Sequence, residues 1–329
     1  MAKTETLALI GGDSLMAREM RDLLAGNALG QDLKLVASDD EEPGKLTVQG
    51  DEPAILSPLD LESLEFAAVV LLAGSAASTR KALEFSPATH LVDLTYAAEE
   101  HPGARLRAPM VEIEPPEDAA HSVNVIANAA AIALATVLGR AHGAHKLIRA
   151  VALIFEPASE RGAPAVDELH KQSVSLLSFK GQPKEIFDAQ LAFNLLARYG
   201  EEAPSTLEES ELRIERHLAT LLSNSSRAPM PSIRLIQAPV FHGYSISLWV
   251  EFESSVTPGM IEQALSGEPV DLRTGDLEPA NVVGMAGQQG IAVTVAQDRN
   301  NSRAAWIWMV TDNLRLRAEN AVAVAHQLL

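Results

Sequence analysis

The sequence predicts an α/β protein built from two domains, and three observations support this prediction. The chain has 329 residues and is 47% hydrophobic, which is enough to form two cores rather than one. In its first third, short and nearly continuous apolar runs alternate with helical patterns, as is typical of a parallel sheet wrapped by helices. Further along, apolar residues follow a period of two, which indicates two-faced strands in a mixed or antiparallel sheet.

The first elements of the N-terminal domain are predicted to be a strand, a turn and a helix. Leu7–Ile10 forms the strand and the two glycines at 11–12 form the turn. Asp13 or Ser14 can cap a helix to about residue 24, because either side chain accepts a hydrogen bond from a free N–H of the first turn. Since a glycine-rich turn lets the backbone approach a pyrophosphate, this pattern is typical of a Rossmann-like dinucleotide-binding domain. Further parallel strands are expected at residues 33–37, 67–72, 91–94 and 123–127.

The second domain is predicted to be α+β with a mixed sheet. Strands are expected at residues 147–154, 245–253 and 304–310, helices at 166–177 and 208–222, and a closing helix at about 314–329. The face of the strand 245–253 that carries Ile246 is apolar and should cover the domain's own helices, whereas Trp249 lies on the other face. Trp306 and Trp308 likewise share one face of the strand 304–310. The proline-rich, acidic run 114–118 is predicted to be a loop.

The charge of the chain disfavours several classes of partner. With 44 acidic and 26 basic residues the formal net charge is −18, so a nucleic-acid backbone or an anionic membrane is repelled. The longest apolar stretch, 123–138, is interrupted by Asn124 and Asn128 and is shorter than the ~20 residues of a membrane span. The N-terminus has no basic region followed by a long apolar core, so we expect no signal peptide and a cytoplasmic protein.

The absence of cysteine excludes disulfides, thiolate metal sites and thiol nucleophiles together. Nine histidines remain as metal ligands, and the closest pair is His142 and His145. No third ligand accompanies this pair, so both are interpreted as surface histidines and no metal site is predicted.

Many segments, in the right order, resemble motifs of the aspartate-semialdehyde dehydrogenase family. In the first domain these are the glycine turn at 11–17 and the segments 37–45, 73–75, 92–99, 109–111 and 126–133. The second domain matches better, at 166–172, 192–194, 206–215, 237–245, 250–253 and 311–317. The phrases VDELHKQS, DAQLAFN and APVFHGYS are most similar to the Usg-type paralogues, a branch without an assigned dehydrogenase role.

The resemblance implies domain limits, an assembly and a cofactor site. It implies a dinucleotide-binding-type domain of residues 1–131 plus 312–329 and a dimerisation domain of residues 132–311, through which two copies pair. The three tryptophans would lie in that interface; the alternative is that they pack under loops of their own subunit. The cofactor positions that it implies are Gly11, Gly12, Asp13, Ser14, Leu15, Met16, Ser38, Ala73, Gly74, Asn128 and Asn313.

The family's catalytic groups are missing from this chain. Its reaction begins when a thiolate attacks an aldehyde, after which hydride passes to a nicotinamide and phosphate cleaves the thioester. The position of that cysteine holds Ala131, and the position of the acid–base histidine holds Tyr244, whose phenol titrates about three units too high for neutral proton transfer. Basic groups that would grip carboxylate and phosphate are replaced by Gln237, Glu211 and Glu99.

One further histidine lies near the replaced one. His242 is two residues from Tyr244 and would face the same side if both belonged to a strand. A structural role is the preferred interpretation, and a shifted catalytic role stays open.

The cofactor turn also departs from the family pattern. Ser14 and Ala17 stand where the second and third glycines belong, and added side chains can block the approach of a pyrophosphate. Acidic residues at 39–42 replace the segment that would hold a 2′-phosphate, so NADP should be repelled. Asp39 could hold the ribose of NAD, although an acidic surface loop is the preferred interpretation. We therefore expect no cofactor, with NAD left open.

Two functions follow as hypotheses. The leading one is a catalytically inactive homologue that acts as a dimeric binding or regulatory protein, with a small-molecule ligand of unnamed kind. The alternative is an NAD(P)-dependent oxidoreductase of the semialdehyde dehydrogenase type, acting on an aldehyde in amino-acid biosynthesis.

Overall fold

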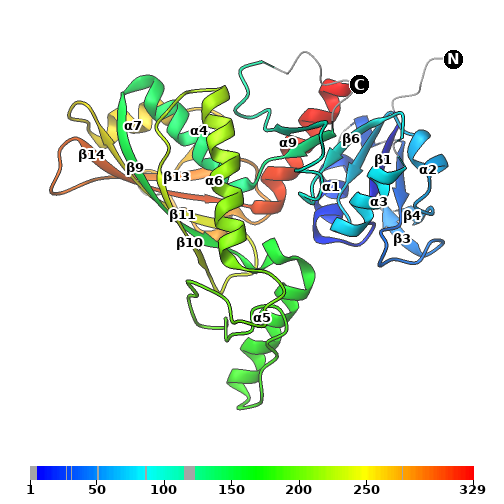
Figure 1. Cartoon of the computed structure of the whole chain (residues 1–329). Coiled ribbons are helices and arrows are strands. Elements are labelled where there is room, and N and C mark those ends of the chain that lie inside the picture. The colour runs from blue at the N-terminus through cyan, green and yellow to red at the C-terminus, as the bar shows by residue number, and fades with distance from the viewer. Residues whose placement is uncertain are drawn as a thin grey trace. The chain divides into compact units, whose positions relative to one another are not determined.

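The computed structural model describes residues 6–26, 28–30, 32–49, 52–85, 87–114, 123–275 and 277–329. The chain divides into two compact units (Figure 1). Unit 1 comprises Met1–Ala127 with Arg317–Leu329, and unit 2 comprises Asn128–Leu316. Of the predicted loop at 114–118, all but Glu114 lies outside the described residues.

Unit 1 contains a six-stranded sheet in the order β2-β1-β5-β6-β8-β7, with every neighbouring pair parallel. Its strands are β1 (Leu7–Ile10), β2 (Leu33–Val36), β5 (Val69–Leu72), β6 (His90–Asp93), β7 (Ala104–Arg107) and β8 (Val123–Ile126). Its helices are α1 (Leu15–Ala25), η1 (Ala28–Gly30), α2 (Leu61–Glu65), α3 (Ala76–Glu84) and the part of α9 (Asn313–Leu328) that follows residue 316. The predicted parallel sheet is confirmed. It could be predicted because short apolar strands that are buried on both faces give a strong local signal in the sequence.

The strand order of unit 1 reverses next to β1. The chain passes from β1 to β2 on one side and later returns to place β5 on the other side of β1. The carboxyl ends of β1 and β5 therefore border the point at which α/β sheets generally bind ligands. An unpredicted hairpin, β3 (Leu46–Gln49) and β4 (Glu52–Ile55), follows β2.

Unit 2 contains a six-stranded mixed sheet in the order β10-β9-β11-β14-β13-β12. Its strands are β9 (Leu147–Glu156), β10 (Ser232–Gln237), β11 (Tyr244–Phe252), β12 (Val270–Leu272), β13 (Ile291–Gln297) and β14 (Ala304–Thr311). Its helices are α4 (Ala129–Ala144), η3 (Ala158–Arg161), α5 (Gly162–Leu177), α6 (Leu207–Asn224), α7 (Pro258–Leu265) and α8 (Val282–Met285). Two pairs are parallel and three are antiparallel, so the predicted mixed sheet is confirmed.

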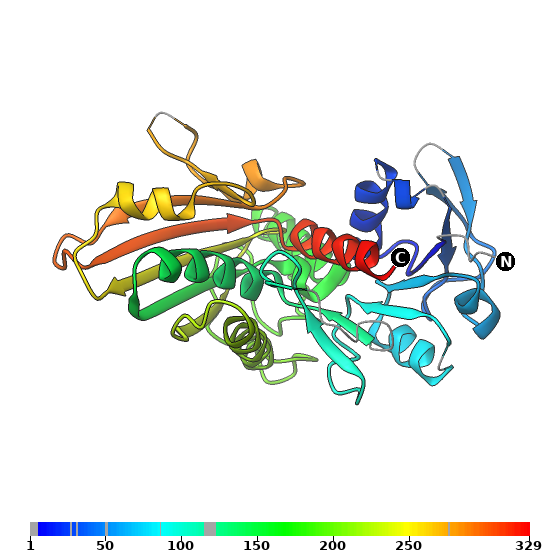
Figure 2. The same ribbon diagram turned by 90° about the horizontal axis from the view of Figure 1, so that it is seen from above.

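The two faces of this sheet differ as the sequence predicts. Ile246 and the other even-numbered residues of β11 are fully buried, and α4 and α7 lie side by side over the sheet (Figure 2). On the opposite face Trp249 lies directly across from Trp306 in the pairing of β11 with β14. Trp306 and Trp308 remain 44% and 36% exposed. The chain thus leaves an aromatic surface on one face of unit 2.

Helix α4 was not predicted, although it carries the position of the family's nucleophile. Its first ten residues are all buried, so it lacks the polar face that makes a surface helix recognisable. Among the helices described in the structure, none combines the length and the apolarity that a membrane crossing requires.

Candidate functional site

The N-terminus of α4 brings together three residues that the sequence analysis singled out. Asn128 caps the helix, and its Oδ1 accepts a hydrogen bond from the Ala130 N–H at 2.8 Å. Its Nδ2 lies 3.4 Å from the hydroxyl of Tyr244, and its backbone N–H donates to Nδ1 of His217 at 3.0 Å. Ala131 lies in the first turn and is completely buried. Its methyl group offers neither a nucleophile nor a hydrogen bond.

A buried carboxylate, missed by the sequence analysis, lies beside Tyr244. Glu156 ends β9 and is 1% exposed, and its Oε2 accepts a hydrogen bond from the Tyr244 hydroxyl at 3.2 Å. Its Oε1 lies 3.4 Å from both the Tyr199 hydroxyl and Nη2 of Arg161. The one signal for it was a charged residue at the end of an apolar strand, which is expensive to bury without a partner.

Gln237 completes this network. It pairs with Glu156 in the register of β10 with β9 and is fully buried. Its Oε1 accepts a 2.6 Å hydrogen bond from the Tyr199 hydroxyl, while its Nε2 donates to the carbonyl oxygens of Glu156 and Ala238. Both ends of the amide are therefore engaged within the protein.

The electrostatics of the network centre on Glu156. Burial raises the pKa of its carboxyl to about 7, although the neighbouring Arg161 acts to lower it. Burial acts to lower the pKa of Arg161, but the Glu156 carboxylate, Tyr199 and Tyr244 together outweigh that effect, and the net direction is upward. Burial and Glu156 also raise the pKa of Tyr199. The site thus holds a carboxyl that can exchange a proton near neutral pH, beside a permanently charged guanidinium.

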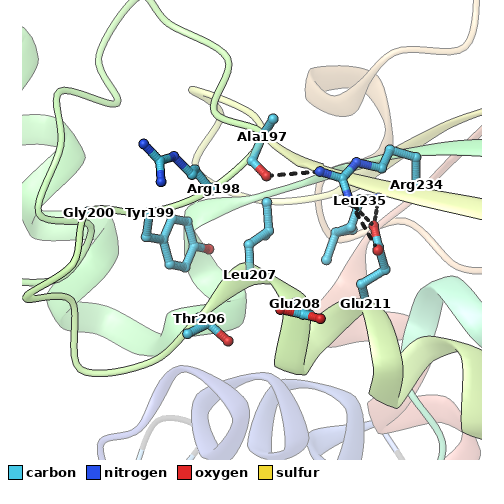
Figure 3. Close-up of a pocket in the computed structure, with 10 residues that line it drawn as sticks. All are labelled: Ala197, Arg198, Tyr199, Gly200, Thr206, Leu207, Glu208, Glu211, Arg234 and Leu235. Atoms are coloured by element: carbon cyan, nitrogen blue, oxygen red, sulfur yellow. Dashed lines mark hydrogen bonds and ion pairs between the residues drawn. The ribbon is translucent and has the colours of Figure 1, made fainter.

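Glu211 lines a pocket that shares Tyr199 with this network (Figure 3). Its carboxylate accepts hydrogen bonds from the Leu235 N–H at 2.5 Å and from Nη1 of Arg234 at 3.2 Å. Arg234 also donates to the carbonyl oxygen of Ala197 at 3.3 Å. The cavity holds about 360 Å³ and is lined by Ala197, Arg198, Tyr199, Gly200, Thr206, Leu207, Glu208, Glu211, Arg234 and Leu235. Where the resemblance implies a free lysine, the chain has a carboxylate that already holds an arginine.

Asn313 ties together three segments of unit 2. Its Oδ1 accepts hydrogen bonds from the Ser159 hydroxyl at 3.1 Å and the Gly243 N–H at 2.9 Å, and its Nδ2 donates to Glu160 at 2.8 Å. His242 precedes Gly243 and lies before β11 begins, so the alternation expected of a strand does not apply to it.

In unit 1, the glycine-rich turn makes close backbone contacts. Gly11 has a φ of 94°, which favours glycine, and a Cβ at this position would collide with Cα of Gly74. Ser14 is the helix cap, since its hydroxyl accepts from the Ala17 N–H at 2.9 Å. The same hydroxyl donates to the carbonyl oxygen of Ala73 at 2.6 Å. Leu15 and Met16 begin α1.

A second carboxylate that the sequence analysis did not single out lies against this turn. Oε2 of Glu41 accepts from the N–H groups of Gly12 at 2.9 Å and Ser38 at 2.8 Å, and its Oε1 accepts from the Asp13 N–H at 2.7 Å. Lys45 forms a 2.6 Å ion pair with Asp13, and this hydrogen bond lowers the pKa of the Asp13 carboxyl.

Asp39 lies in the same loop and is exposed. It accepts hydrogen bonds from the hydroxyls of Ser75 and Ser38. The Ser75 hydroxyl bond lowers the pKa of the Asp39 carboxyl.

The remaining predicted residues lie apart from these two clusters. Glu99 is in the turn after β6 of unit 1. His142 and His145 are half-buried, with His142 accepting from the Leu147 N–H and His145 packed edge-on against Phe252. Within the residues that the structure describes, no group of three or more metal-binding side chains is present.

Comparison with known proteins identifies the relatives of this chain. Residues 147–316 match the family model for the semialdehyde dehydrogenase dimerisation domain. The aspartate-semialdehyde dehydrogenase of Rickettsia bellii is 25% identical over 100% of this chain and 99% of its own length. The USG-1 protein homologue of Azotobacter vinelandii is 32% identical over 53% of this chain and 52% of its own.

Solved structures share the fold. A probable aspartate-semialdehyde dehydrogenase from Pseudomonas aeruginosa superposes with a TM-score of 0.85 at 24% identity, covering 98% of both chains. Aspartate semialdehyde dehydrogenase II from Vibrio cholerae gives a TM-score of 0.82 at 20% identity, again covering 98% of both chains.

Proposed function

Because the chain belongs to the aspartate-semialdehyde dehydrogenase family, we propose that it is a dimeric member that does not catalyse the dehydrogenation and acts as a binding or regulatory protein. The observation that carries this proposal is Ala131. A buried methyl group lies in the first turn of α4, where the resemblance implies the nucleophilic cysteine. A methyl group cannot attack an aldehyde, and the chain has no cysteine to take its place.

The other family positions support the same proposal. The Tyr244 hydroxyl bonds to Glu156, and Gln237 uses both ends of its amide inside the protein. Glu211 holds Arg234 and a backbone N–H. Substrate carboxylate and phosphate need positive charge, but these positions are neutral or acidic. Tyr244, Gln237 and Glu211 therefore bind partners within the protein, and none of them supplies the positive charge that a substrate carboxylate or phosphate would require.

The test is an assay of NAD(P)-dependent oxidation of aspartate semialdehyde in the presence of phosphate or arsenate. We expect no turnover, while a relative that retains its cysteine, assayed in parallel, should be active. Turnover on the order of 1–1000 per second would overturn the proposal, since that is the range of ordinary enzymes.

A second candidate is an NAD(P)-dependent oxidoreductase that acts on an aldehyde by altered chemistry. It is favoured by Glu156, because a carboxyl with a pKa of about 7 beside the Tyr244 hydroxyl can accept and return protons near neutral pH. If the assay detects turnover, Glu156→Gln and Tyr244→Phe should each abolish it. Turnover that survives both substitutions would exclude this mechanism.

The proposed homodimer forms through the open face of the unit 2 sheet. Besides the tryptophans, Val151 and Leu153 of β9, which pair with Trp249 and Ser247 of β11, are 42% and 36% exposed on this face. Aromatic and aliphatic side chains are enriched in interface cores, and one such patch can meet its own copy about a two-fold axis. Light scattering at micromolar concentration tests this: twice the chain mass of 35.1 kDa supports the dimer, and 35.1 kDa itself contradicts it.

The pocket between Arg198 and Glu211 is our candidate for a small-molecule site of this binding protein (Figure 3). A thermal-stabilisation screen over nucleotides and amino-acid metabolites tests it, because a ligand that binds only the folded state raises the unfolding temperature. Adding bulk to the pocket lining by Ala197→Leu should weaken the stabilisation by any ligand that is found there. A ligand whose stabilisation survives that substitution binds elsewhere.

A further inference from the structure

We infer that Glu41 is a built-in anion that takes the place of a nucleotide phosphate and closes the glycine-rich turn of unit 1. The family implies a nicotinamide cofactor at this turn, but the residues present do not fit one. This inference goes beyond the proposed function, because it concerns nucleotide binding in unit 1 and not the chemistry at Ala131.

The Glu41 carboxylate is held by backbone N–H groups of two loops. Three backbone N–H groups converge on it at 2.7–2.9 Å, from Gly12, Asp13 and Ser38. Two of them follow β1 and the third follows β2, so the carboxylate joins two loops at the start of α1. Converging N–H groups before a helix are the arrangement that binds phosphate in dinucleotide-binding turns. The same donors cannot serve the carboxylate and a phosphate at the same time.

Contacts among the loops after β1, β2 and β5 close the crevice between β1 and β5. The Ser14 hydroxyl bridges it by donating to the carbonyl oxygen of Ala73 at 2.6 Å. Next to this bond, Gly11 lies so close to Gly74 that an added Cβ would collide with it. The Ser75 N–H donates to the Ser38 hydroxyl at 3.3 Å, which links the loops after β2 and β5. A pyrophosphate that entered here would have to break contacts of all three loops.

The charge around the turn also disfavours a nucleotide. Asp39, Asp40 and Glu42 flank Glu41 and are exposed, so a 2′-phosphate meets like charge. Lys45 has the sign to attract phosphate, but it is paired with Asp13 at 2.6 Å. The turn is thus repulsive to nucleotides as well as already filled.

A different role for Glu41 predicts the opposite result. In NAD-binding domains a carboxylate after the second strand accepts the ribose hydroxyls. If Glu41 had that role, its removal would weaken NAD binding. If Glu41 replaces the phosphate, its removal should create anion binding that the natural protein lacks.

The experiment is calorimetric titration of the full chain with inorganic pyrophosphate, NADP and NAD. The variants are Glu41→Ala, Glu41→Gln and, as a matched control, Glu42→Ala, which removes the neighbouring, exposed carboxylate of the same acidic run. We expect no binding to the natural protein or to Glu42→Ala at micromolar ligand. Both Glu41 variants should bind pyrophosphate at least about tenfold more tightly, which corresponds to about 1.4 kcal/mol.

Hydrogen exchange of the Gly12, Asp13 and Ser38 amides gives a second measurement. Their protection should fall in Glu41→Ala and return when pyrophosphate is added. The inference is overturned if the natural protein binds NADP with micromolar affinity, if both Glu41 variants bind anions no better than it does, or if it binds NAD and the variants lose that binding. Every variant retains Ala131, so dehydrogenase turnover is measured separately and its appearance would contradict only the proposed function.

Discussion

The buried carboxyl of Glu156 makes the stability of unit 2 depend on pH in a defined way. Its pKa is raised from an ordinary value of 4.5 to about 7, chiefly by burial. A carboxyl whose folded-state pKa is raised contributes its full stability below pH 4.5 and loses it as pH rises through about 7. The natural protein should therefore lose stability over this window relative to a variant that cannot ionise at this position.

The variant is Glu156→Gln, which keeps the size of the side chain and its ability to accept a hydrogen bond from Tyr244. At about 1.36 kcal/mol for each pKa unit, the full effect of the shift is about 3 kcal/mol. Between about pH 5 and pH 8, the stability of the natural protein should fall by about 2–3 kcal/mol more than that of the variant.

Urea unfolding followed by tryptophan fluorescence measures this difference. All three tryptophans lie in unit 2, as Glu156 does, so the signal reports on the correct unit. Protein concentration must be the same throughout, because dimerisation contributes to apparent stability. Glu253→Gln is the control, since its side chain is 61% exposed and should follow the natural protein. Equal pH dependence in the natural protein and Glu156→Gln would refute the reasoning.

Three further substitutions test the site, the interface and the turn. Ala131→Cys should not restore turnover in the dehydrogenase assay, because the basic groups of the family's site are also missing; measurable turnover would contradict this. Trp249→Glu should shift the protein to monomer in light scattering, since an unpaired charge in the interface costs about 3 kcal/mol or more; a dimer that persists would mean that another face forms the contact. Gly11→Ala should destabilise unit 1 by about 1–3 kcal/mol because of its positive φ and its contact with Gly74, measured as faster hydrogen exchange in β1. Gly26→Ala is its control, with a φ of −93° and free space for a Cβ, and equal effects of the two substitutions would contradict the strain argument.

The sequence predicted the elements whose pattern is local. The four consecutive apolar residues of β1 predict a strand buried on both faces, and the alternation in β11 predicts a strand with one buried face. The structure places both strands within one residue of the prediction. The hairpin β3–β4 was missed because Leu46, Val48 and Ile55 are more than half exposed, so burial does not impose the usual pattern. Helix α4 was missed for the opposite reason, since its first ten residues are buried on all sides.

The candidate site was predictable only where a motif names a position. Ala131, Gln237 and Tyr244 were found because neighbouring residues keep the family's order. Their partners were not, because Glu156 and Tyr199 are separated by 43 residues of chain and meet only when β9 and a distant loop pack together. Likewise, nothing in the acidic run 39–42 tells which carboxylate turns back to the glycine turn.

In both clusters, internal carboxylates accept hydrogen bonds from groups of the protein itself. An enzyme that keeps its phosphate turn and its substrate groups open leaves those donors to water until a ligand arrives, and the ligand then stabilises the folded state. Here Glu41 accepts hydrogen bonds from the N–H groups of the turn. In unit 2, Glu156 accepts from the Tyr244 hydroxyl and Glu211 accepts from the Leu235 N–H. The internal carboxylates are present at an effective concentration that a free anion cannot match, because the chain already holds them in place. A nucleotide would therefore have to displace an internal partner and not water, which removes most of its gain in free energy. If both proposals hold, the fold does not depend on the family's ligands, and a function through protein contacts, such as the tryptophan face of unit 2, does not require them.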